Sequence, residues 1–227
     1  MYSLLKRLAS ALPPRAQQEL KRLHFGRQLR AGSFSTAEPE FTRLPCWISA
    51  GDWVIDVGAN VGHYTVRLAQ LVGSTGRVLA FEPVPATFEL LAANVSAAGA
   101  RNVSLFNVAI SSQSAVMGIS MPRFDSGLTN YYMAGLTAAG GEFDVVTMAL
   151  DSIMPPKRVA LIKIDVEGHE LQALRGMQGL LRRDRPRLIV EGTSQEVSAF
   201  LAELNYQFDQ FPQSPNRVFS APRTEMG

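Results

Sequence analysis

WVIDVGANVG, residues 53–62, joins an apolar run to a glycine-rich turn, and this stretch decides how the chain folds. The run Trp53–Val57 is typical of a strand buried on both faces, because such strands carry apolar residues continuously. Residues 58–62 then predict a tight turn, and His63 to Leu71 repeat apolar positions at helical spacing. A buried strand that turns directly into a helix is typical of βαβ units, so the stretch predicts an α/β fold.

The alternation of strands and helices continues along the chain. Apolar runs predict further strands at 77–81, 103–108, 160–164 and 187–190. Helical patterns are expected at 85–98, along Leu171, Leu174, Met177 and Leu181, and once more after Gln195, before short strands at 206–208 and 217–219. Because crossover helices join parallel strands, we expect an open, mostly parallel sheet with helices on both faces.

Residues 111–152 interrupt this alternation, because they are rich in Gly, Ser, Met and Tyr. Strand-like pieces occur at 115–120 and 143–148. We interpret the segment as an antiparallel excursion or a loop near the active face, where substrate specificity often resides.

Composition limits the class of protein. With 227 residues and 46% hydrophobic residues, the chain is expected to form one sizeable domain with a small appendage. Cys46 is the only cysteine, which excludes an intrachain disulfide and every multi-cysteine zinc motif. A single thiol fits a reducing compartment, so a cytoplasmic protein is expected. No run approaches ~18 apolar residues, which argues against a membrane span.

The first 40 residues are expected to form a basic helical arm, followed by one domain at 41–227. Residues 1–32 contain seven basic residues and one acidic residue, a net charge of +6, whereas the whole chain carries +2. Leucines at 4, 5, 8 and 12 recur at helical spacing, and Lys6-Arg7 interrupts any signal-peptide core. We interpret the arm as a helical lid, with a peripheral contact to anionic lipid as the alternative. Nucleic-acid binding is not expected, because the arm lacks interleaved aromatic residues.

The glycine turn and the end of the second predicted strand together indicate a ligand-binding site. Asp56 stands in the first strand, and Gly58 and Gly62 allow a sharp turn and a close approach of the backbone. In open α/β sheets, ligands bind in the crevice outside the carboxyl ends of the strands. Glu82 ends the second strand, where a carboxylate can accept both hydroxyls of a ribose.

Two classes of cofactor contain a ribose that such a carboxylate could bind. A nicotinamide-dinucleotide enzyme would carry G-x-G-x-x-G, but Asn60 stands at the middle glycine position here. Asp56 would also repel a pyrophosphate, whereas it suits the ammonium and sulfonium of S-adenosylmethionine. Charge therefore favours S-adenosylmethionine over NAD.

Several motifs together resemble the FkbM family of S-adenosylmethionine-dependent methyltransferases. They are VIDVGANVGHYT, AFEP, NVAIS at 107–111, LIKIDVEGHE at 161–170 and PRLIVEG, and the match covers roughly residues 44–192. The resemblance implies a class I, Rossmann-like methyltransferase fold with a seven-stranded sheet, and most often methyl transfer to oxygen. The arm and residues 112–150 lie outside the strong match, so the resemblance implies nothing about the acceptor.

The resemblance also implies a set of cofactor-binding residues. The methionine and ribose side of the cofactor would be bound by Asp56, Gly58, Ala59, Asn60 and Gly62. Glu82 would bind the ribose hydroxyls, and the adenine would be flanked by Pro83, Val108 and Ala109. Asp165 would face both the methionine end and the acceptor.

The acids of LIKIDVEGHE allow three interpretations. A Mg²⁺ site would draw on Asp165, Glu167, Glu170 and Glu191, because hard cations prefer carboxylate oxygens. A general base for an alcohol acceptor could be Asp165 or His169, and Asp165 is the preferred candidate, whereas Glu191 could take a catalytic role on the acceptor side or cap a loop. Glu167 and Glu170 could instead stabilise the start of a helix near Gly168.

The sequence therefore predicts a methyltransferase that acts on a hydroxyl of a small-molecule or glycan-like acceptor. A nicotinamide oxidoreductase and a non-catalytic interaction module of the same fold are the alternatives. No oligomeric state follows from the sequence.

Overall fold

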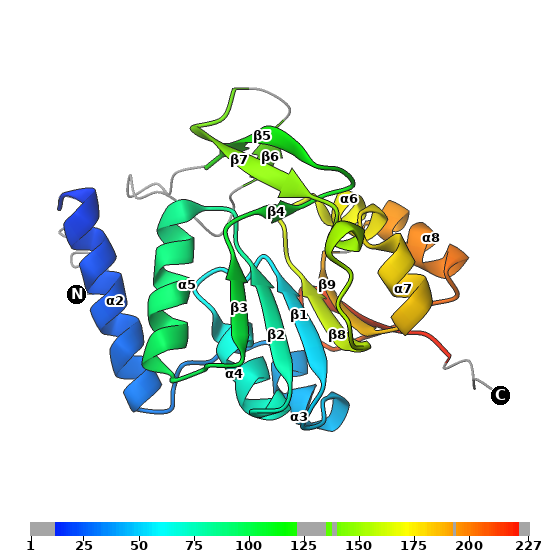
Figure 1. The fold of residues 1–227 in the computed structure, drawn as a ribbon, viewed down its shortest axis with the longest axis horizontal. Helices are drawn as coiled ribbons and strands as arrows, with labels where there is room; N and C mark the ends of the chain where they lie inside the picture. The colour runs from blue at the N-terminus through cyan, green and yellow to red at the C-terminus, as the bar shows by residue number, and fades with distance from the viewer. Residues whose placement is uncertain (1–11, 122–134, 138–139, 193, 223–227) are drawn as a thin grey trace.

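The protein is built around one seven-stranded sheet, shown by a computed structural model that describes residues 12–121, 135–137, 140–192 and 194–222 (Figure 1). The strand order is β10-β11-β9-β8-β1-β2-β3. The bounds are β1 Trp53–Val57, β2 Arg77–Phe81, β3 Val103–Phe106, β8 Val159–Ile164, β9 Arg187–Glu191, β10 Gln207–Gln210 and β11 Asn216–Ser220. Only β11 runs antiparallel to both of its neighbours among these strands. The predicted mostly parallel seven-stranded sheet is confirmed.

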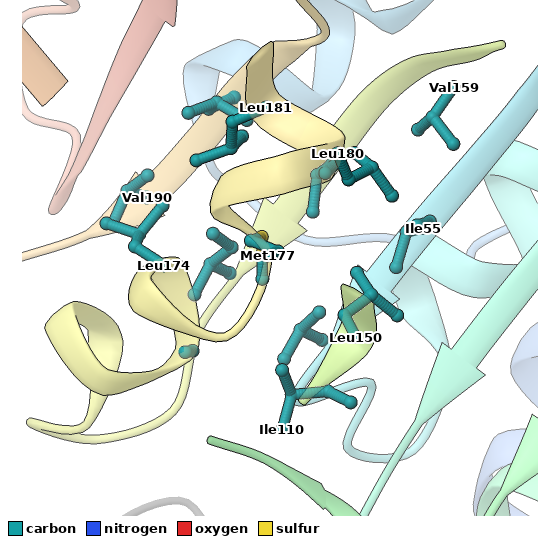
Figure 2. Packing of buried hydrophobic residues seen from close by; sticks show 14 of the residues in the cluster. Ile55, Ile110, Leu150, Val159, Leu174, Met177, Leu180, Leu181 and Val190 are labelled. Carbon is teal, nitrogen blue, oxygen red and sulfur yellow. The ribbon is translucent and has the colours of Figure 1, made fainter. Parts of the chain in front are cut away.

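Helices cover both faces of this sheet, as predicted. One face packs against α3 Leu44–Trp47, α4 His63–Val72 and α5 Pro85–Ala97. The other packs against α6 Glu170–Arg175, α7 Gln178–Asp184 and α8 Gln195–Glu203. Figure 2 shows part of this second core, in which Leu174, Met177 and Leu181 are fully buried. Short 3₁₀ turns lie at η1 Pro39–Arg43 and η3 Leu150–Ile153.

A second, four-stranded sheet lies across the top of the first in Figure 1. Its order is β4-β7-β5-β6, with β4 Ala109–Ile110, β5 Ala115–Ser120, β6 Gly135–Thr137 and β7 Phe143–Met148. β5 and β7 occupy the two ranges expected from sequence and pair antiparallel. The parallel pairing of β4 with β7 was not expected. Ile119 of β5 and Val145 of β7 pack with Ala109 of β4 and with Val84, which precedes α5.

The predicted strand 103–108 ends two residues early. Asn107 donates to the carbonyl oxygens of Glu82 (2.8 Å) and Pro83 (3.0 Å), which turns the chain away from the main sheet. Ala109 then pairs with Thr147 in the second sheet.

The single helix expected across residues 171–181 is two helices. Gly176 lies so close to Ser111 that a Cβ would stand 1.9 Å from the Ser111 carbonyl oxygen. Asp151 caps the second helix, because its carboxylate accepts the N–H groups of Gly179 (2.7 Å) and Leu180 (2.9 Å). Apolar periodicity continues through the break, whereas the cap comes from a residue remote in sequence.

The described part of the arm forms α2, Pro14–Arg30, which packs against α5 as an outer layer (Figure 1). Phe25 is buried beside Val61 and Leu90, and the Gln18 side chain donates to the carbonyl oxygen of Ala86. The first leucines of the predicted pattern, at 4, 5 and 8, lie outside the described residues. In the described part of the chain, no helix has both the length and the apolar character needed to cross a membrane.

Candidate functional site

A hollow opens where β1, β2 and β8 end, at the carboxyl edge of the main sheet. The second sheet closes it from above through Ile119 and Leu136. The predicted cofactor-binding residues that line it are Gly58, Asn60, Glu82, Pro83, Val108, Ala109 and Asp165, and the candidate metal ligand Glu167 lines it as well. This is the edge at which open α/β sheets bind their ligands.

The glycine turn forms the floor of the hollow. Gly58 has φ of 76°, and a Cβ there would lie 1.7 Å from the carbonyl oxygen of Asp165, so any side chain would block the contact between the ends of β1 and β8. Asn60 also adopts a left-handed conformation, with φ of 50°. Asparagine tolerates that region better than most residues, which explains why it can replace a glycine here. Gly62 has φ of 97°, and a Cβ would stand 2.7 Å from Leu91 of α5.

Glu82 is held in place by two backbone amides. Its carboxylate accepts the N–H groups of Asn60 and Val84, each at 2.9 Å, and the residue is 6% exposed. Burial raises its pKa to about 7, against the opposing effect of the two hydrogen bonds. A carboxylate oxygen can accept two hydrogen bonds, so each oxygen keeps acceptor capacity.

The wall next to Glu82 is apolar. Pro83, Val108 and Ala109 line it together with Ile119 and Leu136 from the second sheet. Such a slot fits a flat ring that is flanked on both sides, as the sequence resemblance implies for an adenine.

A buried lysine that the sequence reasoning missed lies behind the turn. Lys163 is opposite Asp56 in the register of β1 and β8, so both side chains lie on the same face of the sheet. It is 5% exposed, and its Nζ lies 2.7 Å from Oδ2 of Asp165 and 4.9 Å from the centre of the Tyr64 ring. Burial alone would lower the pKa of Lys163, but Asp165 and Asp56 outweigh it and raise that pKa.

Asp56 is fully buried rather than part of the surface of the hollow. Its Oδ2 accepts the Thr65 hydroxyl at 2.5 Å. Burial raises the pKa of Asp56, although Lys163 and the hydroxyl act in the opposite direction. Asp56 is therefore placed to order Lys163 and the turn.

Asp165, which lines the hollow, forms a hydrogen-bonded pair with Glu191. Burial acts to raise the pKa of Asp165, but Lys163 and a hydrogen bond with Glu191 outweigh it and hold that pKa below its usual range. The hydrogen bond to Asp165, together with burial, raises the pKa of Glu191 to about 9. Near neutral pH, Asp165 is therefore ionised and Glu191 carries a proton.

Three of the four acids considered as metal ligands come together. One carboxylate oxygen each from Asp165, Glu167 and Glu191 lies within 4.8 Å of the others. Glu170 takes another role, because its Oε1 accepts the N–H of Gly168 at 3.0 Å just before α6. Glu167, with φ of 48°, lies ahead of that helix rather than in its first turn.

His169 contacts Ser111. Its Nε2 lies 2.9 Å from the Ser111 hydroxyl, and burial lowers its pKa. His169, Glu191, Ala59 and Gly62 are not among the residues that line the hollow. Ala59 is buried in the core between α4 and α5, and its amide donates to the carbonyl oxygen of Phe81. The sequence offered no signal for the Ser111 contact, because the two residues are 58 positions apart.

Solved structures share this fold. A methyltransferase FkbM from Methylobacillus flagellatus aligns with a TM-score of 0.55 at 16% identity, over 74% of this chain and 43% of that one. An rRNA methylase from Streptococcus thermophilus aligns with a TM-score of 0.50 at 14% identity, over 81% and 97% of the two chains. A protein from Streptococcus mutans, described as a methyltransferase and solved in complex with SAH, aligns with a TM-score of 0.50 at 13% identity, over 78% and 92% of the two chains. The fold is therefore that of class I methyltransferases.

Two curated relatives match in sequence. Methyltransferase 1 of Beauveria bassiana is 26% identical over 55% of this chain and 58% of its own length. The hexuronic acid methyltransferase AglP of Haloferax volcanii is 29% identical over 58% of this chain and 52% of its own length. The matches thus span little more than half the length of these relatives. The family model of the methyltransferase FkbM domain matches residues 56–208, and the chain belongs to that family.

Proposed function

We propose that the chain is an S-adenosylmethionine-dependent methyltransferase that methylates a hydroxyl of a small-molecule or glycan-like acceptor. The observation that carries this proposal is Glu82, a buried carboxylate whose remaining acceptor capacity lies at the hollow. Its position suits the two hydroxyls of a ribose.

The residues present fit S-adenosylmethionine. Gly58 leaves room against Asp165, the slot beside Pro83 and Val108 is apolar, and Asp165 offers a negative charge to a cationic methionine end. When bound, this cofactor would supply the methyl group on a sulfonium, whose neutral thioether is a good leaving group. The protein's own task is to align the acceptor oxygen and exclude water.

Asp165 is our proposed acceptor of the hydroxyl proton. Lys163 makes it a weak base, but a hydroxyl becomes strongly acidic as its oxygen gains a methyl group, so a weak base suffices. Protonated Glu191 donates to Asp165 and fixes its orientation. His169 is the less favoured base, because its imidazole is engaged with Ser111.

A glycan-like acceptor is supported by one relative, whose name assigns it to hexuronic acid. We propose a sugar hydroxyl as the first acceptor class to screen with radiolabelled S-adenosylmethionine. Incorporation of label into glycans but not into unrelated alcohols would support it, and no incorporation into any hydroxyl compound would contradict methyl transfer to oxygen.

We also propose a cytoplasmic location with peripheral membrane contact through α2. Leu20 and Leu23 of this helix are 47% and 56% exposed, and Arg22 and Arg27 are exposed on the same helix. Exposed leucines between basic residues suit an anionic lipid surface.

Calorimetry tests the cofactor and the role of Glu82. We expect S-adenosylhomocysteine to bind and NAD not to, since the ionised Asp165 lines the hollow beside the glycine turn and would repel a pyrophosphate. Glu82→Gln should weaken S-adenosylhomocysteine about 10- to 100-fold, because hydrogen bonds to a charged acceptor are lost. Because the pKa of Glu82 is raised to about 7, wild-type affinity should be about tenfold weaker at pH 6 than at pH 8. Heat with NAD alone would support the oxidoreductase instead, and pH-independent wild-type affinity would contradict the role of the ionised carboxylate.

The variant Glu191→Gln tests the role of the proton that Glu191 donates to Asp165. The pKa of Glu191 is raised to about 9, so its proton is present below that pH and is lost above it. Wild-type methyl transfer should therefore fall above pH ~9, when a second negative charge forms beside Asp165. Glu191→Gln keeps a donor and should stay within about tenfold of wild type at pH 7, with no fall near pH 9. The same fall in both proteins would show that another group is responsible.

A chelator separates this scheme from a Mg²⁺-dependent one. We expect EDTA to leave the rate unchanged, because Lys163 already supplies the positive charge beside Asp165 and Glu191 is protonated. Initial rates with and without EDTA, and after adding Mg²⁺, give the answer. A rate lost in EDTA and restored by Mg²⁺ would instead assign a cation to Asp165, Glu167 and Glu191.

A further inference from the structure

A second hollow lies at the edge of the main sheet where β1, β8 and β9 begin. We call it the arginine hollow, and its polar lining includes Trp47, Ser49, Asp52, Arg158, Arg185 and Arg187. The candidate methyl-transfer site lies at the other ends of the same strands. A five-residue strand spans about 16 Å, so a ligand in the arginine hollow does not reach the atoms around Asp165.

Three arginines line this hollow. Arg158 precedes β8, Arg187 begins β9, and Arg185 ends α7, so three separate elements supply them. Asp52 is the one acid among the lining residues, and its Oδ2 accepts the N–H of Ser49 at 2.8 Å. The lining therefore carries a net charge of +2, in a domain that is otherwise mildly acidic.

Arg158 and Arg185 are oriented by contacts that leave donors for a ligand. Arg158 uses Nε to donate to the carbonyl oxygen of Asp184 at 3.0 Å, and Arg185 uses Nη1 to donate to that of Leu204 at 2.8 Å. The Arg187 guanidinium stacks over the Trp47 ring, 4.8 Å from its centre. Since each guanidinium has five N–H groups, donors on Arg158 and Arg185 remain beyond these two bonds.

Arg185 has an unusual backbone conformation and a buried donor atom. Its φ of 51° and ψ of 50° place it in the left-handed region at the end of α7, a position that glycine usually takes. Its Nε is buried and has no hydrogen-bond partner in the part of the chain that the structure describes. A buried donor without a partner is costly, and because the guanidinium shares its charge over three nitrogens, an anion in the hollow would stabilise Arg185 without reaching Nε itself.

We propose that the arginine hollow binds the phosphate group of an anionic ligand. Arginine forks match the oxygens of a phosphate in pairs, and two or three of them compensate its double charge. The inference is independent of the methyl-transfer proposal, because it uses none of the residues around Glu82 and Asp165. A soluble phosphate ester and a phospholipid headgroup share this chemistry, so the experiment has an arm for each.

Calorimetry of the full chain with pyrophosphate is the primary test. We expect wild type to bind and the double variant Arg158→Gln, Arg185→Gln to bind at least about tenfold more weakly, because charged hydrogen bonds are lost. Arg175→Gln removes an exposed arginine from α6 and is the matched control, with affinity unchanged. Arg158→Lys keeps the charge without the fork and should fall between wild type and Arg158→Gln.

Vesicles identify the source of the phosphate. Co-sedimentation with phosphatidylcholine vesicles, with and without phosphatidic acid, is compared between wild type and the double variant. Phosphatidic-acid binding that is weaker in the double variant than in wild type would assign a lipid headgroup, whereas equal vesicle binding by both proteins, through α2, together with the loss of pyrophosphate binding would assign a soluble ester. Circular dichroism melting checks folding, and Arg158→Gln alone carries the test if the double variant does not fold. No binding of either probe by wild type, or equal weakening in Arg175→Gln, would overturn the proposal.

Discussion

Replacing Asp165 with asparagine is expected to reduce methyl transfer about 10³-fold, the middle of the range for loss of a positioned proton acceptor. The substitution keeps the shape of the side chain, but it removes the negative charge that faces the methionine end and the acceptor hydroxyl. Steady-state rates with the acceptor found in the glycan screen measure the effect.

Cofactor affinity distinguishes this role from a structural one. Asp165→Asn should weaken S-adenosylhomocysteine by no more than about tenfold, so most of the loss should appear in the rate of transfer. Asp209→Asn, an exposed change on β10, should leave both quantities unchanged. Full activity of Asp165→Asn would show that another group accepts the proton.

Replacing Lys163 with methionine is expected to lower the free energy of unfolding by about 3–5 kcal/mol at pH 7. The reason is that Asp165 loses a partner at 2.7 Å, and buried Asp56 loses its neighbouring positive charge. Lys157→Met, an exposed change two residues before β8, should stay within about 0.5 kcal/mol of wild type. Urea unfolding measures both variants.

The loss of stability in Lys163→Met should also depend on pH. In wild type, the pKa of Asp165 is below its usual range, so its contribution to stability is present above the unfolded pKa and is lost in acid. Without Lys163, burial raises the pKa of Asp165, and the folded variant binds protons more tightly than the unfolded chain. The deficit relative to wild type should therefore shrink between pH 7 and pH 5. An equal deficit at both pH values would contradict the electrostatic explanation.

The main sheet could be predicted because its signal is local. Each buried strand carries a continuous apolar run, and the glycine turn at Gly58 marks where the first strand ends. The break between α6 and α7 could not be predicted, since Asp151 caps the second helix from 28 residues away. The same holds for Asn107, whose bonds to the loop after β2 end the third strand.

Some residues of the candidate site could also be predicted from the sequence, and others could not. Glu82 follows directly from its place at the end of β2, and its assignment needed no tertiary information. Lys163 looks like an ordinary strand residue until the register of β1 and β8 puts it beside Asp56. The raised pKa of Glu191 likewise depends on Asp165. Asp165 is 26 positions earlier in the chain, and the two side chains meet only in the folded protein.

The second sheet separates two kinds of evolutionary change. Residues 109–148 provide Ile119 and Leu136 to the hollow, whereas the turn, Glu82 and Asp165 belong to the main sheet and its loops. Insertions or exchanges in this excursion can therefore reshape the apolar wall beside Glu82 without moving the carboxylates. A lineage that inherits this chain can change how the proposed adenine slot closes, while the glycine turn and the carboxylates stay under separate selection.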